Sequence, residues 1–324
     1  MAVDYGVYNL TRKTSVLAKT ETTYNTDPGL SASTNAMLLF DEVNPVQRDT
    51  KIVQKDVVRS SFTKYPDLVG RSLYNLSLKT VLMGSGTAGS APFFAPLLKA
   101  CGMSEASGSS GGGSYVQYKP VSGSFSSVYV GVYAQELLHK IGGAYGTFTM
   151  EGRAGEAVDV MFSMKGTYTA PSTSSVPSLT LPTDRKVLME SEGLSFSSTA
   201  SWTPIVRSFK LDSGVQIIER ADFNASKGLG ALLITDRRPT LNLVIEVENT
   251  LANKNFNTLI DAATTSDVIT WTHGTTAGNK AVFTVNNPQI VNLQYQDDQG
   301  VRTYSIDYKL QNSTDDGEYT IDMR

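Results

Sequence analysis

The sequence predicts a mainly β chain that folds as two tandem antiparallel β-sandwich or barrel domains, each with one short α-helix, plus extended arms and loops. Three observations lead to this prediction: a strand-then-helix cassette occurs twice, each half of the chain ends in a hairpin pattern, and long helical patterns are absent. Runs of alternating apolar and polar residues bounded by turn residues are typical of half-buried antiparallel strands. Strands with few helices favour a sandwich or a barrel.

The strand of each cassette has the period of two that places alternate side chains on one face of a sheet. The apolar positions are Tyr74, Leu76, Leu78 and Thr80 in the first copy and Leu241, Leu243, Ile245 and Val247 in the second. Chance alternation in two β-rich halves is the competing interpretation. The helical stripe that follows each strand and the shared order of elements favour duplication.

The helix of each cassette carries apolar residues at i, i+3, i+4 and i+7, which form one face of a helix. These residues are Phe94, Leu97, Leu98 and Cys101 in the first copy and Phe256, Leu259, Ile260 and Ala263 in the second. We expect both helices to pack this face against the core. Cys101 is expected to be a small buried core residue rather than a reactive thiol.

A hairpin pattern closes each half. Residues 148–164 alternate on both sides of a turn that contains Gly155, and residues 290–310 alternate around a turn that contains Asp297, Asp298 and Gly300. Glycine adopts a positive φ at little cost, and Asp forms local hydrogen bonds in turns. Further strand signals occur at 128–132, 208–211, 215–218 and 281–285.

Composition shifts divide the chain into an N-terminal arm at 1–35, a first domain at 36–168, a linker at 169–184 and a second domain at 185–324. The linker is rich in Pro, Ser and Thr. Residues 104–114, SEASGSSGGGS, predict a flexible surface loop. The polar segments 1–35 and 41–68 predict either arms that become ordered against a neighbouring subunit or ordinary long loops.

The charge balance limits the classes of partner. The 324 residues carry a net charge of −3, with no stretch rich in Lys or Arg, so a high-affinity nucleic-acid surface is not expected. No apolar run approaches the roughly 20 residues of a membrane-spanning helix, and the first 15 residues lack a signal-peptide core. We therefore expect synthesis in the cytosol and no membrane insertion.

No group of residues predicts catalysis, a metal site or a cofactor. His139 and His273 lie far apart in sequence, and a pairing of Cys101 with His139 as a nucleophilic couple is a weak alternative to structural roles for both. The acidic pairs at 297–298 and 315–316 fit solvated turns better than a calcium loop. Residues 84–90, GSGTAGS, lack the Lys of a phosphate-binding loop. We expect a protein that is not an enzyme.

Three segments carry a resemblance to a known family. AKTETTYNTDPGLSASTNAMLL at 18–39, LLITDRRPTLNLVIEV at 232–247 and QYQDDQGVRTYSIDYKL at 294–310 resemble the tail tube proteins, or major tail proteins, of long, non-contractile-tailed bacteriophages of the siphovirus type. The segments are spread over most of the chain. None is a catalytic signature, and together they are more specific than any one alone.

The resemblance implies a structural virion protein. In that family, subunits form rings, sheets of neighbouring subunits join into an inner β-barrel, and stacked rings form a tube with an acidic lumen. The expected partners are further copies of the chain, the tape measure protein in the lumen, the tail-tip and tail-terminator proteins, and DNA in transit during ejection. Assembly would occur in the host cytoplasm. Rings of this family contain six copies of the fold, so a duplicated chain predicts a trimer with pseudo-sixfold symmetry rather than a hexamer.

Two other functions are kept as alternatives. A tail-tip or decoration protein could bind host-surface glycans through aromatic side chains, and the chain has 15 tyrosines. A hydrolase on a β-scaffold ranks last because no acid/base pair supports it.

Overall fold

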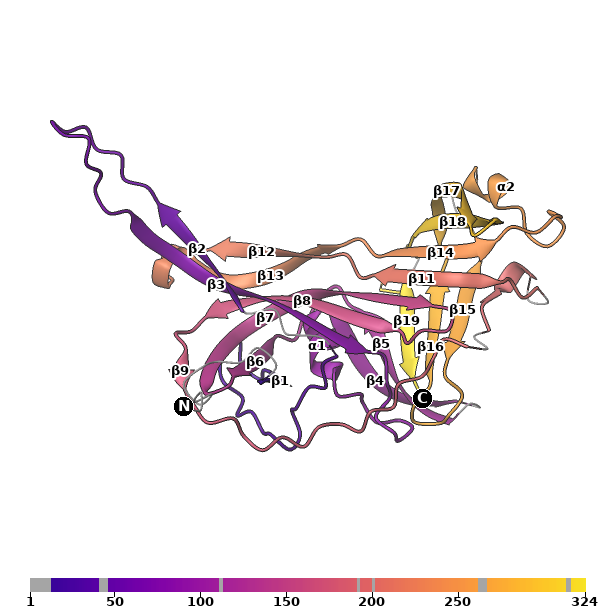
Figure 1. Cartoon of the computed structure of the whole chain (residues 1–324), viewed down its shortest axis with the longest axis horizontal. Helices are drawn as coiled ribbons and strands as arrows, with labels where there is room; N and C mark the ends of the chain where they lie inside the picture. The colour runs from indigo at the N-terminus through magenta and orange to yellow at the C-terminus, as the bar shows by residue number, and fades with distance from the viewer. Residues whose placement is uncertain are drawn as a thin grey trace, which may run out of the picture.

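The chain is mainly β, with antiparallel pairing throughout, as the sequence predicts. The structure is a computed structural model that describes residues 13–40, 46–110, 113–190, 193–199, 202–261, 267–312 and 316–324. The described residues form two short helices, and Figure 1 shows them beside longer strands.

The first half of the chain supplies the strands coloured indigo to pink in Figure 1. They are β1 (Thr14–Thr20), β2 (Gln47–Val53), β3 (Leu68–Val81), β4 (Met103–Ser110), β5 (Gly113–Pro120), β6 (Val128–Ala134), β7 (Leu137–Arg153), β8 (Asp159–Tyr168) and β9 (Ser172–Thr173), with helix α1 (Ala95–Ala100) after β3.

The second half supplies the remaining elements. They are β10 (Ser195–Phe196), β11 (Val206–Asp212), β12 (Val215–Ala221), β13 (Leu229–Arg237), β14 (Thr240–Glu246), β15 (Val268–His273), β16 (Ala281–Asn286), β17 (Gln289–Asp298), β18 (Val301–Lys309) and β19 (Tyr319–Met323), with the 3-10 turns η1 (Ser197–Thr199) and η2 (Ser226–Gly228) and helix α2 (Phe256–Ile260).

One large sheet contains strands of both halves. Its main row has the order β17-β18-β14-β11-β7-β8-β3-β2, and β1, β6 and β9 attach through β7. A second sheet, β10-β15-β16-β19-β5-β4, also combines both halves, because β19 pairs with β5. The halves on either side of residues 169–184 therefore share both sheets, and the division into two domains stays a prediction.

The core lies between the two sheets and extends around α1. Strand alternation places Leu78 and Phe162 on the core face of the large sheet, where both are fully buried. Phe209 of the large sheet meets Trp271 of the second sheet with ring centroids 5.2 Å apart, and Trp271 stacks on Phe283 at 4.7 Å. Aromatic pairs at these distances add about 0.5–1.5 kcal/mol each to the gain from burial.

Two predicted flexible segments are ordered strands instead. Residues 14–20 of the predicted N-terminal arm form β1, because Val16, Leu17 and Ala18 bury their side chains when β1 pairs with β6. The predicted surface loop 104–114 largely forms the β4–β5 hairpin, since backbone hydrogen bonding to β5 holds a Ser- and Gly-rich edge strand that has few side chains to pack. Residues 1–12 lie outside the described ranges.

Candidate assembly surfaces

The joint between the two halves is a pair of antiparallel strands, β7 and β11. Leu211 lies opposite Met150 and Phe209 lies opposite Gly152, and the three larger side chains are at most 2% exposed. Gly152 makes room for Phe209, because a Cβ there would lie 2.6 Å from the aromatic ring. The two halves therefore meet through a closely packed apolar joint that continues the sheet.

The strand order repeats on the two sides of this joint. The row divides into β17-β18-β14-β11 and β7-β8-β3-β2, in which β17 corresponds to β7, β18 to β8, β14 to β3 and β11 to β2. Leu76 of β3 lies opposite Met164, as Leu243 of β14 lies opposite Ile306. The corresponding strands thus have the same neighbours in the same register.

A shared irregularity supports this correspondence. The pairing of β7 with β8 shifts register just before the pair Tyr145 and Lys165. The pairing of β17 with β18 shifts just before Asn292 and Asp307, which occupy the corresponding positions. A bulge at a matched position is a specific feature that alternation alone does not produce.

The two ends of the row are edge strands. Among the described strands, β2 pairs with β3 alone and β17 pairs with β18 alone. Arg48 of β2 lies 4.1 Å from the ring centre of Tyr168 and donates from Nη2 to Ser72 Oγ at 3.2 Å. At the other end of the row, Asp297 accepts a hydrogen bond from the Gly300 N–H at 3.1 Å. Among the described residues no further strand pairs with either edge, so both edges are candidates for pairing with a strand of another chain.

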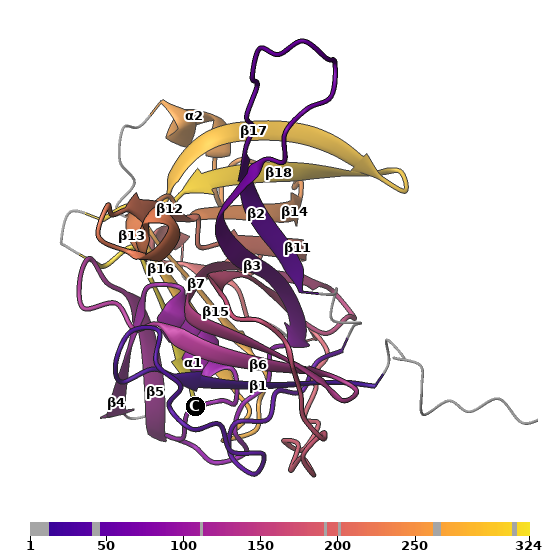
Figure 2. The same ribbon diagram turned by 90° about the vertical axis from the view of Figure 1, so that its left-hand side faces the viewer.

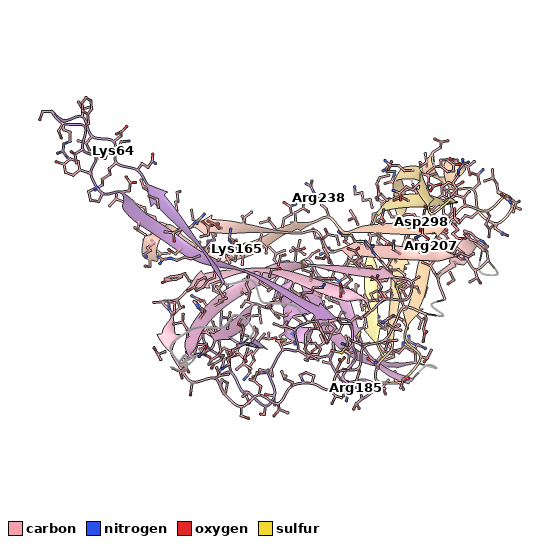
Figure 3. All side chains as sticks on the ribbon, in the orientation of Figure 1. Lys64, Lys165, Arg185, Arg207, Arg238 and Asp298 are labelled. Atoms are coloured by element: carbon pink, nitrogen blue, oxygen red, sulfur yellow. The ribbon has the colours of Figure 1, made fainter. Side chains whose placement is uncertain are left out.

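The face of the large sheet that points away from the core is polar, and its charges pair with one another. Lys79 Nζ lies 3.1 Å from Asp159 Oδ2, and Arg207 Nη2 lies 2.6 Å from Glu246 Oε1. Figure 3 shows Arg207 near Asp298, and Lys165 apart from both on β8. This face carries both signs of charge rather than acidic residues alone.

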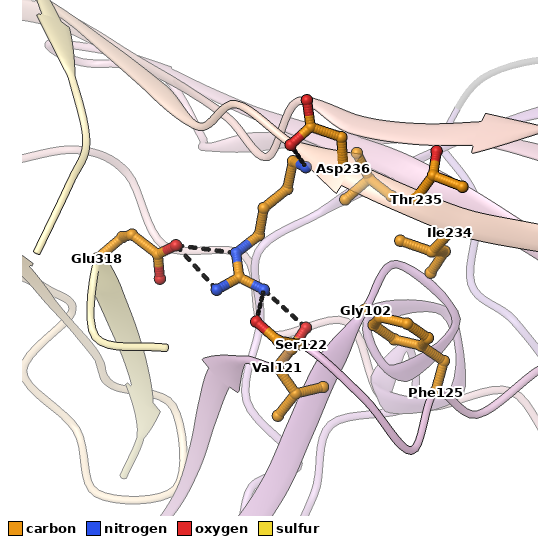
Figure 4. Close-up of a pocket in the computed structure, with 10 residues that line it drawn as sticks. Gly102, Val121, Ser122, Phe125, Ile234, Thr235, Asp236 and Glu318 are labelled. Carbon is orange, nitrogen blue, oxygen red and sulfur yellow. Dashed lines mark hydrogen bonds and ion pairs between the residues drawn. The ribbon is translucent and has the colours of Figure 1, made fainter. Parts of the chain in front are cut away.

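A cavity of about 320 Å³ lies where the β12–β13 hairpin leaves the sheet (Figure 4). Arg237 borders it and donates to Asp316 Oδ1 at 2.7 Å, to Glu318 Oε1 at 2.9 Å and to the Val121 carbonyl at 2.7 Å. Burial would lower the pKa of Arg237, but the two carboxylates outweigh it and raise the pKa. The guanidinium is occupied by these partners, so it ties the hairpin to the C-terminal strand rather than offering a site for an anionic ligand.

The predicted helix residues are placed differently in the two cassettes. Phe94, Leu97, Leu98 and Cys101 of the first are all at most 2% exposed. In the second, Phe256 is buried and Leu259 is partly buried against the core, but Ile260 is 40% exposed, which corrects the expectation for that residue. Helix α2 has only five residues, so it is too short for the residues at i, i+3, i+4 and i+7 to form one helix face against the core. Ala263 lies outside the described residues.

The predicted turn residues form two different turns. Gly155, with φ of +81°, lies in the five-residue connection between β7 and β8. Gln299 and Gly300 alone form the β17–β18 turn, both with positive φ as in a type I′ turn. Asp297 and Asp298 are therefore the last residues of β17 rather than loop residues.

The side chains considered for catalysis are buried in the fold or lie within hydrogen-bond distance of a neighbouring side chain. Burial raises the pKa of the Cys101 thiol and lowers the pKa of His139, whose Nδ1 lies 3.2 Å from the Tyr74 hydroxyl. His273 is buried in β15. Within the described ranges, no three His, Cys, Asp or Glu side chains gather as metal ligands.

Sequence reasoning did not predict the joint between β7 and β11 or the two edge strands of the large sheet. Alternation identified β7 and β11 as strands, but it does not show which strands are neighbours. Arg48 and Asp297 are charged residues within strand patterns, and charged side chains are typical of exposed edge strands. This is the one sequence signal that points to these two edges.

No protein-family model matches the chain, and a search of curated proteins finds no similar sequence. In the described part of the chain, no helix is both long and apolar enough to span a membrane.

Proposed function

We propose that this protein is a structural virion protein that polymerises into stacked rings and forms the tail tube of a siphovirus-type phage, a conduit for DNA delivery. The observation that carries the proposal is the repeated strand order of the large sheet, with the β7–β11 joint at its centre and edge strands at its two ends. The resemblance of three segments to tail tube proteins agrees with it.

The internal joint gives a pattern for the contact between copies. Because β2 corresponds to β11 and β17 to β7, β2 of one copy would pair with β17 of the next as β11 pairs with β7. The internal register then places Arg48 opposite Asp297 of the partner subunit, since Leu211 lies opposite Met150. Opposite charges would meet at this position.

Ring closure would remove every free edge of the row. Three copies of the eight-strand row make a barrel of 24 strands. With strands about 4.8 Å apart and tilted by about 40°, the backbone of such a barrel would be about 50 Å across. A ring of three chains with pseudo-sixfold symmetry follows, rather than a ring of six.

The part of the polar face that β12 and β13 leave uncovered would line the lumen, because the opposite face is covered by the core. Ion pairs such as Lys79–Asp159 leave few unpaired cations to hold a polyanion, which suits transient passage of DNA and contact with a tape measure protein. The tail-tip and tail-terminator proteins would contact the two ends of the tube. The proposed location is the phage tail, with assembly in the host cytoplasm.

Negative-stain and cryo-electron microscopy of the purified chain test this proposal. Rings or tubes with three chains per ring are expected. Six chains per ring would overturn the trimer, and dispersed monomers that bind glycans would overturn the tube in favour of a tail-tip or decoration protein.

A further inference from the structure

Two hairpins extend from corresponding positions in the two halves. The first arm (Lys51–Val69) joins β2 to β3, and the second arm (Val215–Arg237) joins β11 to β14. Because β2 corresponds to β11 and β3 to β14, the arms are counterparts. Figure 1 shows the first arm extending away from the body at the upper left, while the second arm lies along the sheet.

The second arm packs on the polar face of the first half. Leu232, 1% exposed, forms a buried cluster with Leu73 and Tyr145. Lys165 Nζ lies 2.7 Å from Glu219 Oε1 of the arm, and the Leu232 N–H donates to Tyr24 Oη at 2.8 Å. This contact combines an apolar side chain with a salt bridge.

Among the residues that the structure describes, the first arm has no such platform within its own chain. Every residue from 51 to 69 is exposed, and eight of them are large apolar residues: Ile52, Val53, Val57, Val58, Phe62, Tyr65, Leu68 and Val69. Val58 and Phe62 are exposed as fully as in an extended chain. A concentration of apolar side chains of this kind marks a protein contact surface. Four Lys or Arg and two Asp give the arm a net charge of +2.

The second half has the corresponding platform, and among the described residues no arm packs on it, although Asn242 and Asn292 donate hydrogen bonds to Asp307. Asp307 occupies the position of Lys165, and Arg238 that of Arg71. Beside them is a groove of about 590 Å³ whose lining includes Arg238, Lys309 and Asn312. Val291, in the β17 bulge, is 58% exposed. Figure 2 shows the first arm projecting beyond the end of the sheet.

We propose that the first arm of one copy packs on this platform in the next copy of the ring, as the second arm packs on the first half of its own chain. The occupant is a second copy of this chain, and the inference rests on the proposed ring. Inside the chain, Glu219 of the second arm forms ion pairs with Lys165 and Arg71. The position of Arg71 keeps its positive charge as Arg238, but the position of Lys165 becomes acidic, so the first arm, with its net charge of +2, would meet Asp307 of the partner subunit.

Photocrosslinking tests the contact in assembled rings. Phe62 is replaced by p-benzoylphenylalanine, and subunits labelled with ¹⁴N and ¹⁵N are mixed before assembly, so that mass spectrometry separates crosslinks between copies from those within one. The expected crosslinks join Phe62 to residues 238–246 or 289–312 of a different copy. Phe223, equally exposed at the tip of the second arm, is the matched control site.

The outcomes separate the arm contact from the ring. Rings in which the Phe62 probe reacts only within its own chain, or with other segments, overturn the arm contact and leave the proposed function standing. The same peptides captured equally from Phe223 also overturn it, because the contact would then be nonspecific. Absence of rings in the unsubstituted protein overturns the proposed function itself.

Discussion

Reversing the charge of Arg48 or Asp297 tests the register at which neighbouring copies would pair. The variants are Arg48→Asp, Asp297→Lys and the double exchange of both. In the proposed ring each single variant places like charges opposite each other, and the double variant restores an opposite pair with its direction inverted. Asp184→Lys, at the end of the linker, and Arg185→Asp, the residue after it, lie away from both sheet edges and are matched controls.

The expected size of the effect follows from the position of the pair. An opposite-charge pair across strands contributes about 0.2–1 kcal/mol, and like charges destabilise by a similar amount. Each single variant therefore weakens one interface by about 0.4–2 kcal/mol, or about 2- to 30-fold in its association constant. A closed ring of three chains contains three such interfaces, so the effect on ring formation is about 1–6 kcal/mol.

Sedimentation velocity over a concentration series, with negative-stain microscopy, measures the midpoint of assembly. The single variants should assemble at higher concentration than the unsubstituted chain and the controls, and the double variant should recover most of the loss. A double variant no better than the singles refutes the register. Single variants that assemble normally refute the pairing of β2 with β17.

Three further predictions concern the subunit alone and are measured by urea unfolding. Asp267→Ala leaves the buried Lys254 ammonium without its carboxylate and should cost about 3–5 kcal/mol, against less than about 0.5 for the exposed Asp261→Ala; an equal loss in both contradicts it. Burial would raise the pKa of Asp267, but Lys254 and its hydrogen bonds lower it overall, so this stability is present above the usual Asp range and is lost as pH falls through the lowered pKa. Leu211→Ala, fully buried at the joint, should cost about 2–5 kcal/mol in a single transition, and two separated transitions would show that the halves unfold independently. Gly300→Ala, at φ of +88°, should cost about 1 kcal/mol, and a neutral result would contradict a required positive φ.

Local pattern predicted much of the fold, because strand alternation and turn chemistry act over a few residues. The strands of both cassettes, both hairpins and the strand signals near 128, 208, 215 and 281 are all present. Segments 14–20 and 104–114 were predicted wrongly because pairing with β6 and β5 decided their structure. Such partners are distant in sequence or add backbone hydrogen bonds that composition does not reveal.

The candidate assembly surfaces were the least predictable part. Sequence pointed to duplication and to arms, but the joint between β7 and β11 depends on which strands become neighbours, and that is a property of the whole sheet. Ile260 is a smaller example. The sequence contains the apolar helix positions, but helix α2 ends at Ile260, and sequence pattern did not predict that end.

The two kinds of joint differ in polarity for a physical reason. The joint within the chain buries Phe209, Leu211 and Met150, because covalent connection brings β7 and β11 together during folding and the apolar strands need never face water for long. The proposed joint between copies uses Arg48 and Asp297, which remain exposed in the free subunit. An apolar edge there would pair with any available strand, whereas charged residues at a defined register disfavour wrong pairing and permit the one that matches them. In the proposed ring, the repeated strand order would therefore place an apolar joint where the chain itself ensures pairing and a charged joint where pairing must wait for another copy.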